Sequence, residues 1–274
     1  MNDYIRYRYH VAHFDADVVS TDLFEMGCLG ITELSQTWFE AFFPNQPEIR
    51  VTTEDYFNTH ARPYEACAVQ DEDWMAAFRT HVKPVCLTPH ITVHPDPSTL
   101  PTSLLPGHVT LVIPPKMSFG TGHHETTRLC AQLIEAYALH CTSLLDVGTG
   151  TGLLALVARQ SGITEVLALD NDPTILDNVA ENIAQNDKNV FSFFIGTLSN
   201  LTQDKRWDMV AANLISSVIY EWLPSLLVHA RRYLLFSGIL TSEQALFREK
   251  MIAAGLTPLC EKTENEWYAG LYTK

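Results

Sequence analysis

The chain has 274 residues, 46% of them hydrophobic and 18% charged, so it can bury the core of an α/β domain of roughly 200 residues and form a second, smaller unit. Aromatic residues reach 10%, and glycine and proline are at ordinary levels, which excludes disordered and collagen-like chains. The net charge of −14 disfavours direct nucleic-acid binding, because an acidic surface repels phosphates, and favours a basic protein partner.

The pattern of cysteines and the lengths of the apolar segments indicate in which cellular compartment the protein resides. Six scattered cysteines without a Cys-x-x-Cys pair favour reduced thiols in the core over disulfides or zinc ligands. The first residues lack the apolar segment of a signal peptide, and no apolar run approaches the roughly 18 residues of a membrane span. We therefore expect a cytoplasmic protein without a membrane partner, and a monomer.

The pattern of residues 1–60 predicts a small α+β domain. Tyr4–Val11 alternates apolar and polar positions, as a half-buried strand does. Asp15–Met26 carries apolar residues at helical spacing, and Thr37–Phe43 suggests a second strand. A strand–helix–strand opening of this length predicts a ferredoxin-like module.

A linker is expected over residues 61–85. Glu72–Phe78 has a helical pattern, and six prolines between Pro84 and Pro106 exclude long helices and favour short extended pieces. The second domain is therefore expected over residues 86–274.

From about residue 108, strand and helix signals alternate, which predicts a doubly wound parallel sheet with helices on both faces. The expected strands are Ser143–Val147, Glu165–Asp170, Val190–Ile195, Trp207–Ala212 and Tyr233–Leu240, and the expected helices are Leu153–Gln160, Pro173–Gln185 and one through Ile219 and Leu226. The last two strands, Leu256–Lys262 and Glu266–Tyr272, should form an antiparallel hairpin at the sheet edge. This ending is typical of the Rossmann-like class I methyltransferase fold and not of dehydrogenases.

A glycine loop follows the first of these strands. Gly148, Gly150 and Gly152 allow a tight turn and a close approach of a ligand to the backbone, just after the strand that contains Asp146. Leu153 occupies the place where a dinucleotide-binding loop needs its third glycine. We interpret the segment as the binding loop for S-adenosylmethionine; the alternative is a glycine-rich turn without a ligand.

An acidic residue follows one βα unit later. Asp170 ends the second strand, where a carboxylate can accept hydrogen bonds from both ribose hydroxyls, and Asn171 follows it. Asp172 with Pro173 is expected to cap and start the next helix. The alternative for Asp170 is the same capping role.

Asn213 and Leu214 follow the fourth strand of the series. The carboxamide oxygen of Asn213, with a neighbouring backbone carbonyl, can accept N–H bonds from an amine and direct its lone pair at a methyl donor. The alternative is a helix N-cap, where asparagine is also favoured.

A polar loop with two glycines precedes a helix that is expected to begin near Thr126. Phe119, Gly120, Thr121 and Gly122 predict a flexible lid over the cofactor. The adjacent sequence His123-His124-Glu125 lacks the spacing of a helical ligand pair, so no metal site is expected there.

These segments together resemble the ribosomal protein L11 methyltransferase family. The resemblance rests on Asp73-Trp74, Phe119-Gly120-Thr121-Gly122 with Thr126-Thr127, the glycine loop, Asp170-Asn171-Asp172-Pro173, Ala212-Asn213-Leu214 and Ser237-Gly238-Ile239-Leu240. It implies an enzyme that trimethylates the N-terminal α-amine and lysine side chains of a large-subunit ribosomal protein. The N-terminal domain of this enzyme would recognise the substrate. The resemblance also implies that Thr127, Gly148, Asp170 and Asn213 contact S-adenosylmethionine and that Asn213 and Leu214 border the target nitrogen.

The sequence departs from the family pattern in places. His123-His124-Glu125 replaces a usual Thr-His-Pro, Ala230-Arg231-Arg232 replaces a Pro-Gly-Gly turn, Thr149 replaces a common cysteine, and Gly196-Thr197 stands where relatives place a carboxylate near the adenine. Three other functions remain as alternatives: methylation of another protein, of RNA or of a small-molecule amine; a nucleotide-dependent oxidoreductase; and a non-catalytic module that binds S-adenosylmethionine.

Overall fold

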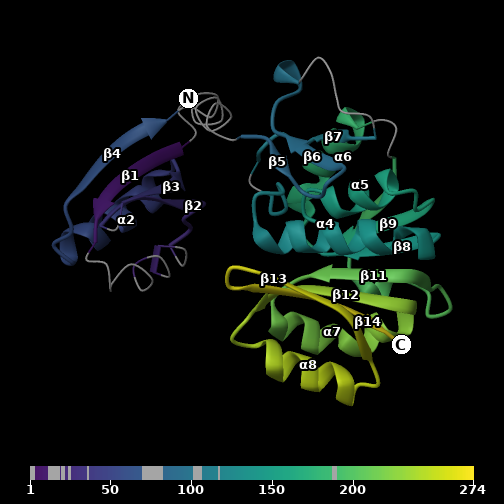
Figure 1. Cartoon of the computed structure of the whole chain (residues 1–274). Helices are drawn as coiled ribbons and strands as arrows, with labels where there is room; N and C mark the ends of the chain where they lie inside the picture. The colour runs from purple at the N-terminus through teal and green to yellow at the C-terminus, as the bar shows by residue number, and fades with distance from the viewer. Residues whose placement is uncertain are drawn as a thin grey trace. The chain divides into compact units, whose positions relative to one another are not determined.

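The computed structural model describes residues 4–11, 19, 22–23, 26–35, 37–69, 83–100, 107–116, 118–186 and 190–274. The chain forms two compact units, Met1–His81 and Val82–Lys274 (Figure 1). Among the helices of the described ranges, none is long and apolar enough to cross a membrane.

The first unit contains a four-stranded antiparallel sheet with the strand order β2-β3-β1-β4. Its elements are β1 (Tyr4–His10), β2 (Gly30–Ser35), β3 (Trp38–Pro44), α2 (Pro47–Thr59) and β4 (Tyr64–Val69). β1 and β3 confirm the two predicted strands. β4 lies within the predicted linker and corrects its boundary, because this strand pairs with β1; its central residues are exposed, so no apolar alternation marked it.

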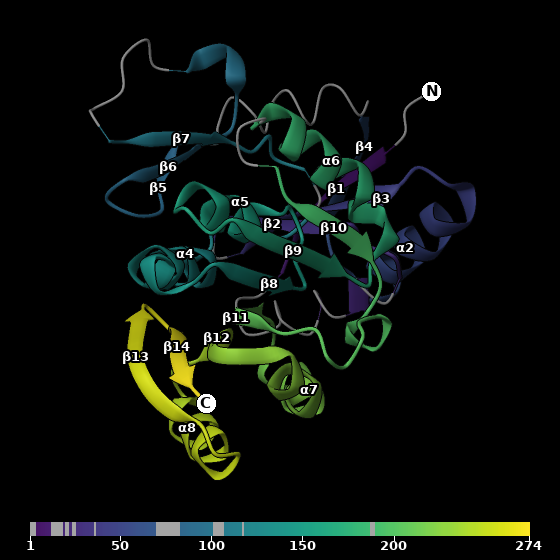
Figure 2. The ribbon, with the colours of Figure 1, turned by 90° about the vertical axis from the view of Figure 1, so that its right-hand side faces the viewer.

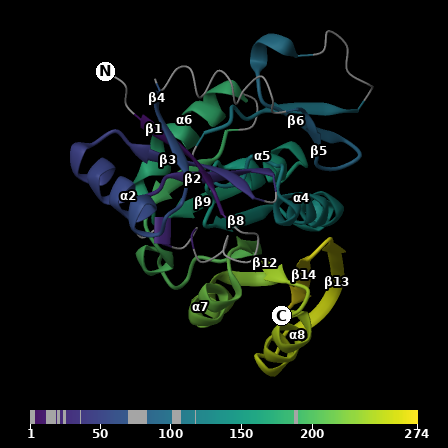
Figure 3. The same ribbon diagram turned by 90° about the vertical axis from the view of Figure 1, so that its left-hand side faces the viewer.

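The alternating residues of β1 form the core of this unit. Ile5, Tyr7 and Tyr9 are buried on one face of the sheet, where Tyr7 and Tyr9 contact Phe57. Phe57 belongs to α2, which lies beside β3 (Figure 3). Val19 and Leu23 join the same core, but most of the predicted helix Asp15–Met26 lies outside the described residues, as does Glu72–Phe78. The ferredoxin-like assignment therefore stays a prediction.

The second unit is built on a seven-stranded sheet with the order β10-β9-β8-β11-β12-β14-β13. Its strands are β8 (Ser143–Val147), β9 (Glu165–Asp170), β10 (Ser192–Ile195), β11 (Trp207–Asn213), β12 (Ala230–Leu240), β13 (Thr257–Glu264) and β14 (Trp267–Thr273). The first five are parallel, and the last two form the predicted antiparallel hairpin, with β14 paired to β12 and β13 at the edge.

Helices cover both faces of this sheet (Figure 2). α4 (Glu125–Tyr137), α5 (Leu153–Gln160) and α6 (Leu176–Gln185) share one apolar core, while α7 (Ser216–His229) and α8 (Gln244–Ala253) share the other. α8 was not predicted, since only Phe247 and Met251 of its residues are buried. The proline-rich stretch forms short strands as expected: β5 (Val85–Cys86), β6 (Ile91–His94) and β7 (Val109–Val112).

The six cysteines are free thiols, as the sequence suggests, but they do not all lie in the core. Cys28, Cys130 and Cys141 are buried, whereas Cys67 and Cys86 are exposed. Both exposed cysteines lie in short strands whose side chains are only partly covered.

The carboxyl ends of the parallel strands bring the predicted site segments together. β8 lies between β9 and β11, with Val147 paired to Leu169 on one side and to Ala212 on the other. The loops that follow these strands therefore emerge side by side at the carboxyl ends of the strands, where open α/β sheets bind ligands.

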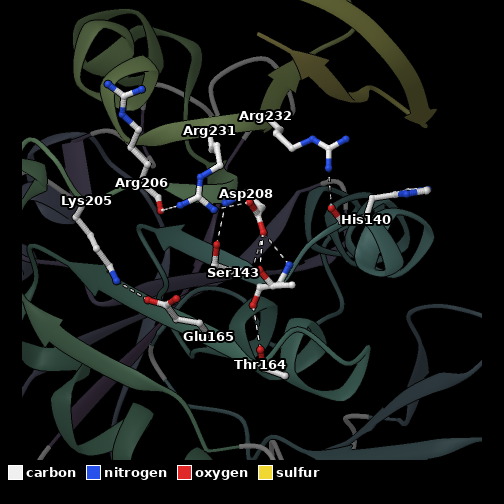
Figure 4. A network of polar contacts seen from close by, with 10 residues as sticks. His140, Ser143, Thr164, Glu165, Lys205, Arg206, Asp208, Arg231 and Arg232 are labelled. Carbon is white, nitrogen blue, oxygen red and sulfur yellow. Dashed lines mark hydrogen bonds and ion pairs between the residues drawn. The ribbon is translucent and has the colours of Figure 1, made fainter.

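A polar cluster around the buried Asp208 lies at the opposite end of the strands, where β8 and β11 begin (Figure 4). The Asp208 carboxylate accepts hydrogen bonds from the backbone N–H and hydroxyl of Thr142, both at 2.8 Å, and from the Arg231 guanidinium at 2.8 Å. Burial raises the pKa of Asp208, but these donors outweigh it and lower the pKa to about 2.

We expect Asp208→Asn to lower the free energy of unfolding near neutral pH by about 2 kcal/mol, the value of a charge-assisted network of this kind. Because the folded-state pKa is depressed, this contribution is present above the unfolded pKa and is lost as pH falls from about 4 toward 2. Urea unfolding of both proteins across this range measures the difference. Glu165→Gln, which removes the exposed Lys205 ion pair, is the control and should change stability little. Equal losses of unfolding free energy in the two variants would contradict the stabilising role of Asp208.

Candidate functional site

The glycine loop packs so closely that side chains are excluded at each glycine. A Cβ atom at Gly150, where φ is +54°, would lie 2.3 Å from the Phe119 carbonyl oxygen, and one at Gly148 would lie 2.5 Å from Leu214 Cδ2. At Gly152 the neighbour of the Cβ position is the ring of Phe191, at 2.8 Å. The loop therefore presents bare backbone at the carboxyl end of β8.

Residues 119–122, predicted as a lid, lie against this loop through Thr151. The Thr151 N–H donates to the Phe119 carbonyl at 3.0 Å, and its hydroxyl donates to the Gly120 carbonyl at 2.7 Å. Asn182 on α6 donates in turn to the Thr151 carbonyl at 2.8 Å. Thr151 is fully buried, and through these hydrogen bonds it joins the glycine loop to residues 119–122.

We expect Gly150→Ala to weaken binding of S-adenosylmethionine about tenfold or more. The added methyl must displace the Phe119 backbone and so disrupts the packing of the loop, in addition to straining the left-handed backbone. Gly162→Ala is the matched control, because Gly162 also has positive φ (+97°) but has open space around its Cβ position. Titration calorimetry on the three proteins separates the clash from the strain; equal affinities in all three would refute the close approach.

Two carboxylates flank the glycine loop in different environments. Asp146 is fully buried; burial raises its pKa to about 6, although the Thr149 hydroxyl donates to it at 2.6 Å. Its Oδ1 has no hydrogen-bond partner among the described residues. Asp170 is half-buried and accepts hydrogen bonds from the Gly150 N–H at 2.9 Å and the Asp172 N–H at 3.1 Å.

Capping is confirmed for Asp172 and not for Asp170. The Asp172 carboxylate accepts from the Thr174 N–H at 2.8 Å and caps the short helix Pro173–Ile175. Asp170 instead points to the glycine loop, and Asn171 beside it is exposed.

Asn213 ends β11 and does not cap the next helix, whose N-cap is Ile215, so that alternative is wrong. Its amide nitrogen donates to the Thr126 hydroxyl at 3.2 Å. Its carboxamide oxygen is buried and has no hydrogen-bond partner in the described part of the chain.

Leu214 lies beside the glycine loop. Its N–H donates to the Ser237 carbonyl at 3.1 Å, and its side chain contacts the Gly148 position. A Cβ at Gly238, where φ is +84°, would lie 2.4 Å from the Leu214 carbonyl oxygen. The Ser237-Gly238 pair therefore gives the backbone of Leu214 room to approach β12.

The start of α4 supplies the remaining polar groups. Thr126 and Thr127 are buried, and the Thr127 hydroxyl has no partner among the described residues. His124 is the N-cap of α4, and its ring contacts Phe119 at 5.3 Å and Trp267 at 4.8 Å between centroids. Thr121 lies at the margin, where its hydroxyl is 3.4 Å from His123 Nδ1.

Most predicted site residues are thus brought together, and several contributors were missed. Phe119, Gly120, Asp170 and Leu214 all contact the glycine loop, and Asn213 joins α4 through Thr126. The contributions of Thr151, Asn182 and Trp267 had no signal in the sequence, because each depends on a tertiary contact. Thr126 belongs to the resemblance, but its contact with Asn213, 87 positions away, could not be predicted.

The chemistry of the site fits the expected cofactor. Three polar atoms, Asp146 Oδ1, Thr127 Oγ1 and Asn213 Oδ1, are buried without partners among the described residues, which is costly unless a ligand satisfies them. The glycine loop follows the strand that carries Asp146, and Asp170, which accepts the Gly150 N–H, keeps further acceptor capacity beside it.

Comparisons with known proteins agree with this geometry. The sequence profile described as ribosomal protein L11 methyltransferase matches residues 4–274. The ribosomal protein L11 methyltransferase of Thermus thermophilus is 34% identical over 257 residues, which cover 92% of each chain. The protein of the same name from Chlorobaculum tepidum is 29% identical over 275 residues, covering 92% of this chain and 93% of that one.

The fold is also seen in a solved structure. A ribosomal protein L11 methylase from Lactobacillus delbrueckii subsp. bulgaricus superposes with a TM-score of 0.63 at 22% identity, over 70% of this chain and 99% of that one. This likeness confirms the predicted class I methyltransferase fold.

Proposed function

The chain belongs to the ribosomal protein L11 methyltransferase family, and from this premise we propose that it transfers methyl groups from S-adenosylmethionine to amino groups of ribosomal protein L11. The targets we propose are lysine side chains and the N-terminal α-amine. The observation that carries the proposal is the carboxamide oxygen of Asn213, which is buried without a partner among the described residues at the carboxyl end of the sheet.

The residues around the glycine loop would hold the cofactor. Asp170 would accept hydrogen bonds from the ribose hydroxyls, and the backbone at Gly148 and Gly150 would line the methionine part. The Thr127 hydroxyl, which has no partner among the described residues, would form a hydrogen bond with the ligand. When bound, S-adenosylmethionine supplies a methyl group on a sulfonium, which is an electrophile without further activation.

The protein's own contribution would be alignment of the amine. Asn213 Oδ1 accepts one N–H of the target nitrogen, which directs the lone pair, and Leu214 provides an apolar wall. The N–C bond forms as the S–C bond breaks, and the amine proton leaves to water. The target must be neutral to react, and burial of an ammonium lowers its pKa.

The charge and organisation of the chain support a basic protein substrate. A net charge of −14 favours encounter with a lysine-rich protein and disfavours RNA. We place substrate recognition in the first unit, because the second holds all the candidate catalytic groups. A ribosomal protein substrate would be met in the cytoplasm.

The experiment uses labelled S-adenosylmethionine with purified L11, and in parallel with ribosomal RNA and a total ribosomal protein mixture. We expect the label in L11 alone, and mass spectrometry should locate it on lysines and the N-terminal amine. Label in RNA or in another protein would replace the substrate assignment, and absence of any transfer by cofactor-bound protein would refute the function.

A further inference from the structure

We infer that His124 is a positioning residue, which acts through the Thr126 hydroxyl to hold the Asn213 carboxamide with its oxygen toward the target amine. The inference rests on the proposed function and adds to it the reason why the amide has one orientation and not the flipped one.

Three residues from two elements form the chain of contacts. The Thr126 hydroxyl lies 2.8 Å from His124 Nδ1, and Asn213 Nδ2 donates to the same hydroxyl at 3.2 Å. His124 Nδ1 also accepts the Thr126 backbone N–H at 3.3 Å, as the cap of α4. All three side chains are held at fixed positions by the start of α4 and the end of β11.

The donors and acceptors fix the direction of this chain. Because the cap geometry has His124 Nδ1 accept the Thr126 N–H, we assign no proton to this nitrogen. The Thr126 hydroxyl then donates its one proton to the same lone pair. Only lone pairs of the hydroxyl then face Asn213, and only an N–H of the carboxamide can meet them. The carboxamide oxygen must point the other way, where it is buried and has no described partner.

Without an acceptor at position 124 this constraint is removed. The Thr126 hydroxyl could then donate to Asn213 Oδ1, and the amide could turn its NH₂ toward the target amine. Two donors would face each other at the reaction site, and the nitrogen lone pair would no longer be directed at the methyl group.

The surroundings of His124 keep its ring neutral and in place. Burial lowers the pKa of His124, and Arg128 acts in the same direction, while Glu125 on α4 and Glu266 in the turn before β14 oppose it. The rings of Phe119 and Trp267 lie against the imidazole. Protonation would turn Nδ1 into a donor and break the chain. Beyond the loss of activity caused by protonation of the target amine, a further loss is therefore expected below the usual pKa range of histidine.

The test uses paired variants at both positions. His124→Leu and Thr126→Val remove the acceptor and the hydroxyl, and each should lower kcat about tenfold or more, as expected for loss of a positioned group. His124→Asn and Thr126→Ser keep the corresponding groups and should retain most of the activity. The affinity for S-adenosylmethionine, measured by calorimetry, should change far less than kcat in all four.

The double variant His124→Leu/Thr126→Val separates positioning from helix capping. If His124 acts through the Thr126 hydroxyl, the double variant loses no more kcat than either single one. The Asn variant should keep the loss of activity caused by protonation of the target amine and should lack only the further loss at lower pH, because asparagine does not titrate. The inference would be overturned if the double variant lost kcat by the product of the two single losses. It would also be overturned if His124→Leu unfolded more easily yet turned over normally. A wild-type protein that binds the cofactor but methylates nothing would instead refute the proposed function, and the inference with it.

Discussion

Asn213→Ala is expected to lower kcat for L11 methylation roughly 10²-fold, while the free energy of unfolding stays almost unchanged. The carboxamide oxygen has no partner among the described residues, so its removal costs no hydrogen bond there. The substitution also removes the hydrogen bond from Asn213 Nδ2 to the Thr126 hydroxyl, which sets the direction of the carboxamide but, at 3.2 Å, should contribute only about 0.5 kcal/mol to stability. A buried acceptor without a partner is costly to the fold, so we explain its presence by a role in the reaction.

The same substitution at Asn186 provides the control with the opposite pattern. The Asn186 carboxamide accepts from the Val112 N–H at 2.9 Å and donates to the Val112 carbonyl at 2.8 Å, in the interior of the second unit. Asn186→Ala should lower the free energy of unfolding by about 2 kcal/mol because it leaves two buried backbone groups unpaired, with little effect on kcat of the folded enzyme. Normal turnover by Asn213→Ala would remove this residue from the mechanism.

Asp170→Ala is expected to weaken binding of S-adenosylmethionine roughly 10²- to 10⁴-fold. Two hydroxyls that donate to a carboxylate each contribute about 1.5–3 kcal/mol, and the substitution removes both bonds together. The carboxylate also holds the Gly150 N–H at 2.9 Å, so the glycine loop loses its support from β9. Calorimetry and the cofactor-induced shift in the unfolding temperature both measure this loss.

Asp172→Ala is the control for charge and for local structure. Asp172 is two residues away and its carboxylate is used by the helix cap at Thr174. This variant should lose some stability and keep its cofactor affinity within about threefold, since no ligand contact is removed. Comparable losses of affinity in the two variants would mean that the effect of Asp170 comes from charge alone.

The parts of the fold with a strong local pattern could be predicted from the sequence. β8, β9 and β11 are mostly apolar, β9 and β11 end at the polar residues Asp170 and Asn213, and the glycine loop lies between β8 and α5 where it was expected. Fully buried parallel strands carry this signal because both of their faces are covered. The positions of Gly148, Asp170 and Asn213 follow from the same rule, since parallel strands end at one edge.

Other parts could not be predicted, because their pattern is weak or their contacts are distant. β4 exposes its central residues and α8 buries only two, so neither has a clear period. Thr151 looks like any loop residue until its hydroxyl is seen to hold Gly120. In the sequence His124 suggests only a metal ligand with unsuitable spacing; its contact with Thr126, and through it with Asn213, comes from the docking of α4 on β11.

Calorimetric titration of S-adenosylmethionine and of its demethylated product into the folded protein tests the central claim, that bare backbone after β8 and the carboxylate after β9 form one nucleoside site. Saturable binding of both compounds to the wild type, greatly weakened in Asp170→Ala and unaffected in Asp172→Ala, is the expected result. No heat of binding from folded wild-type protein, or equal binding by all three proteins, would contradict it.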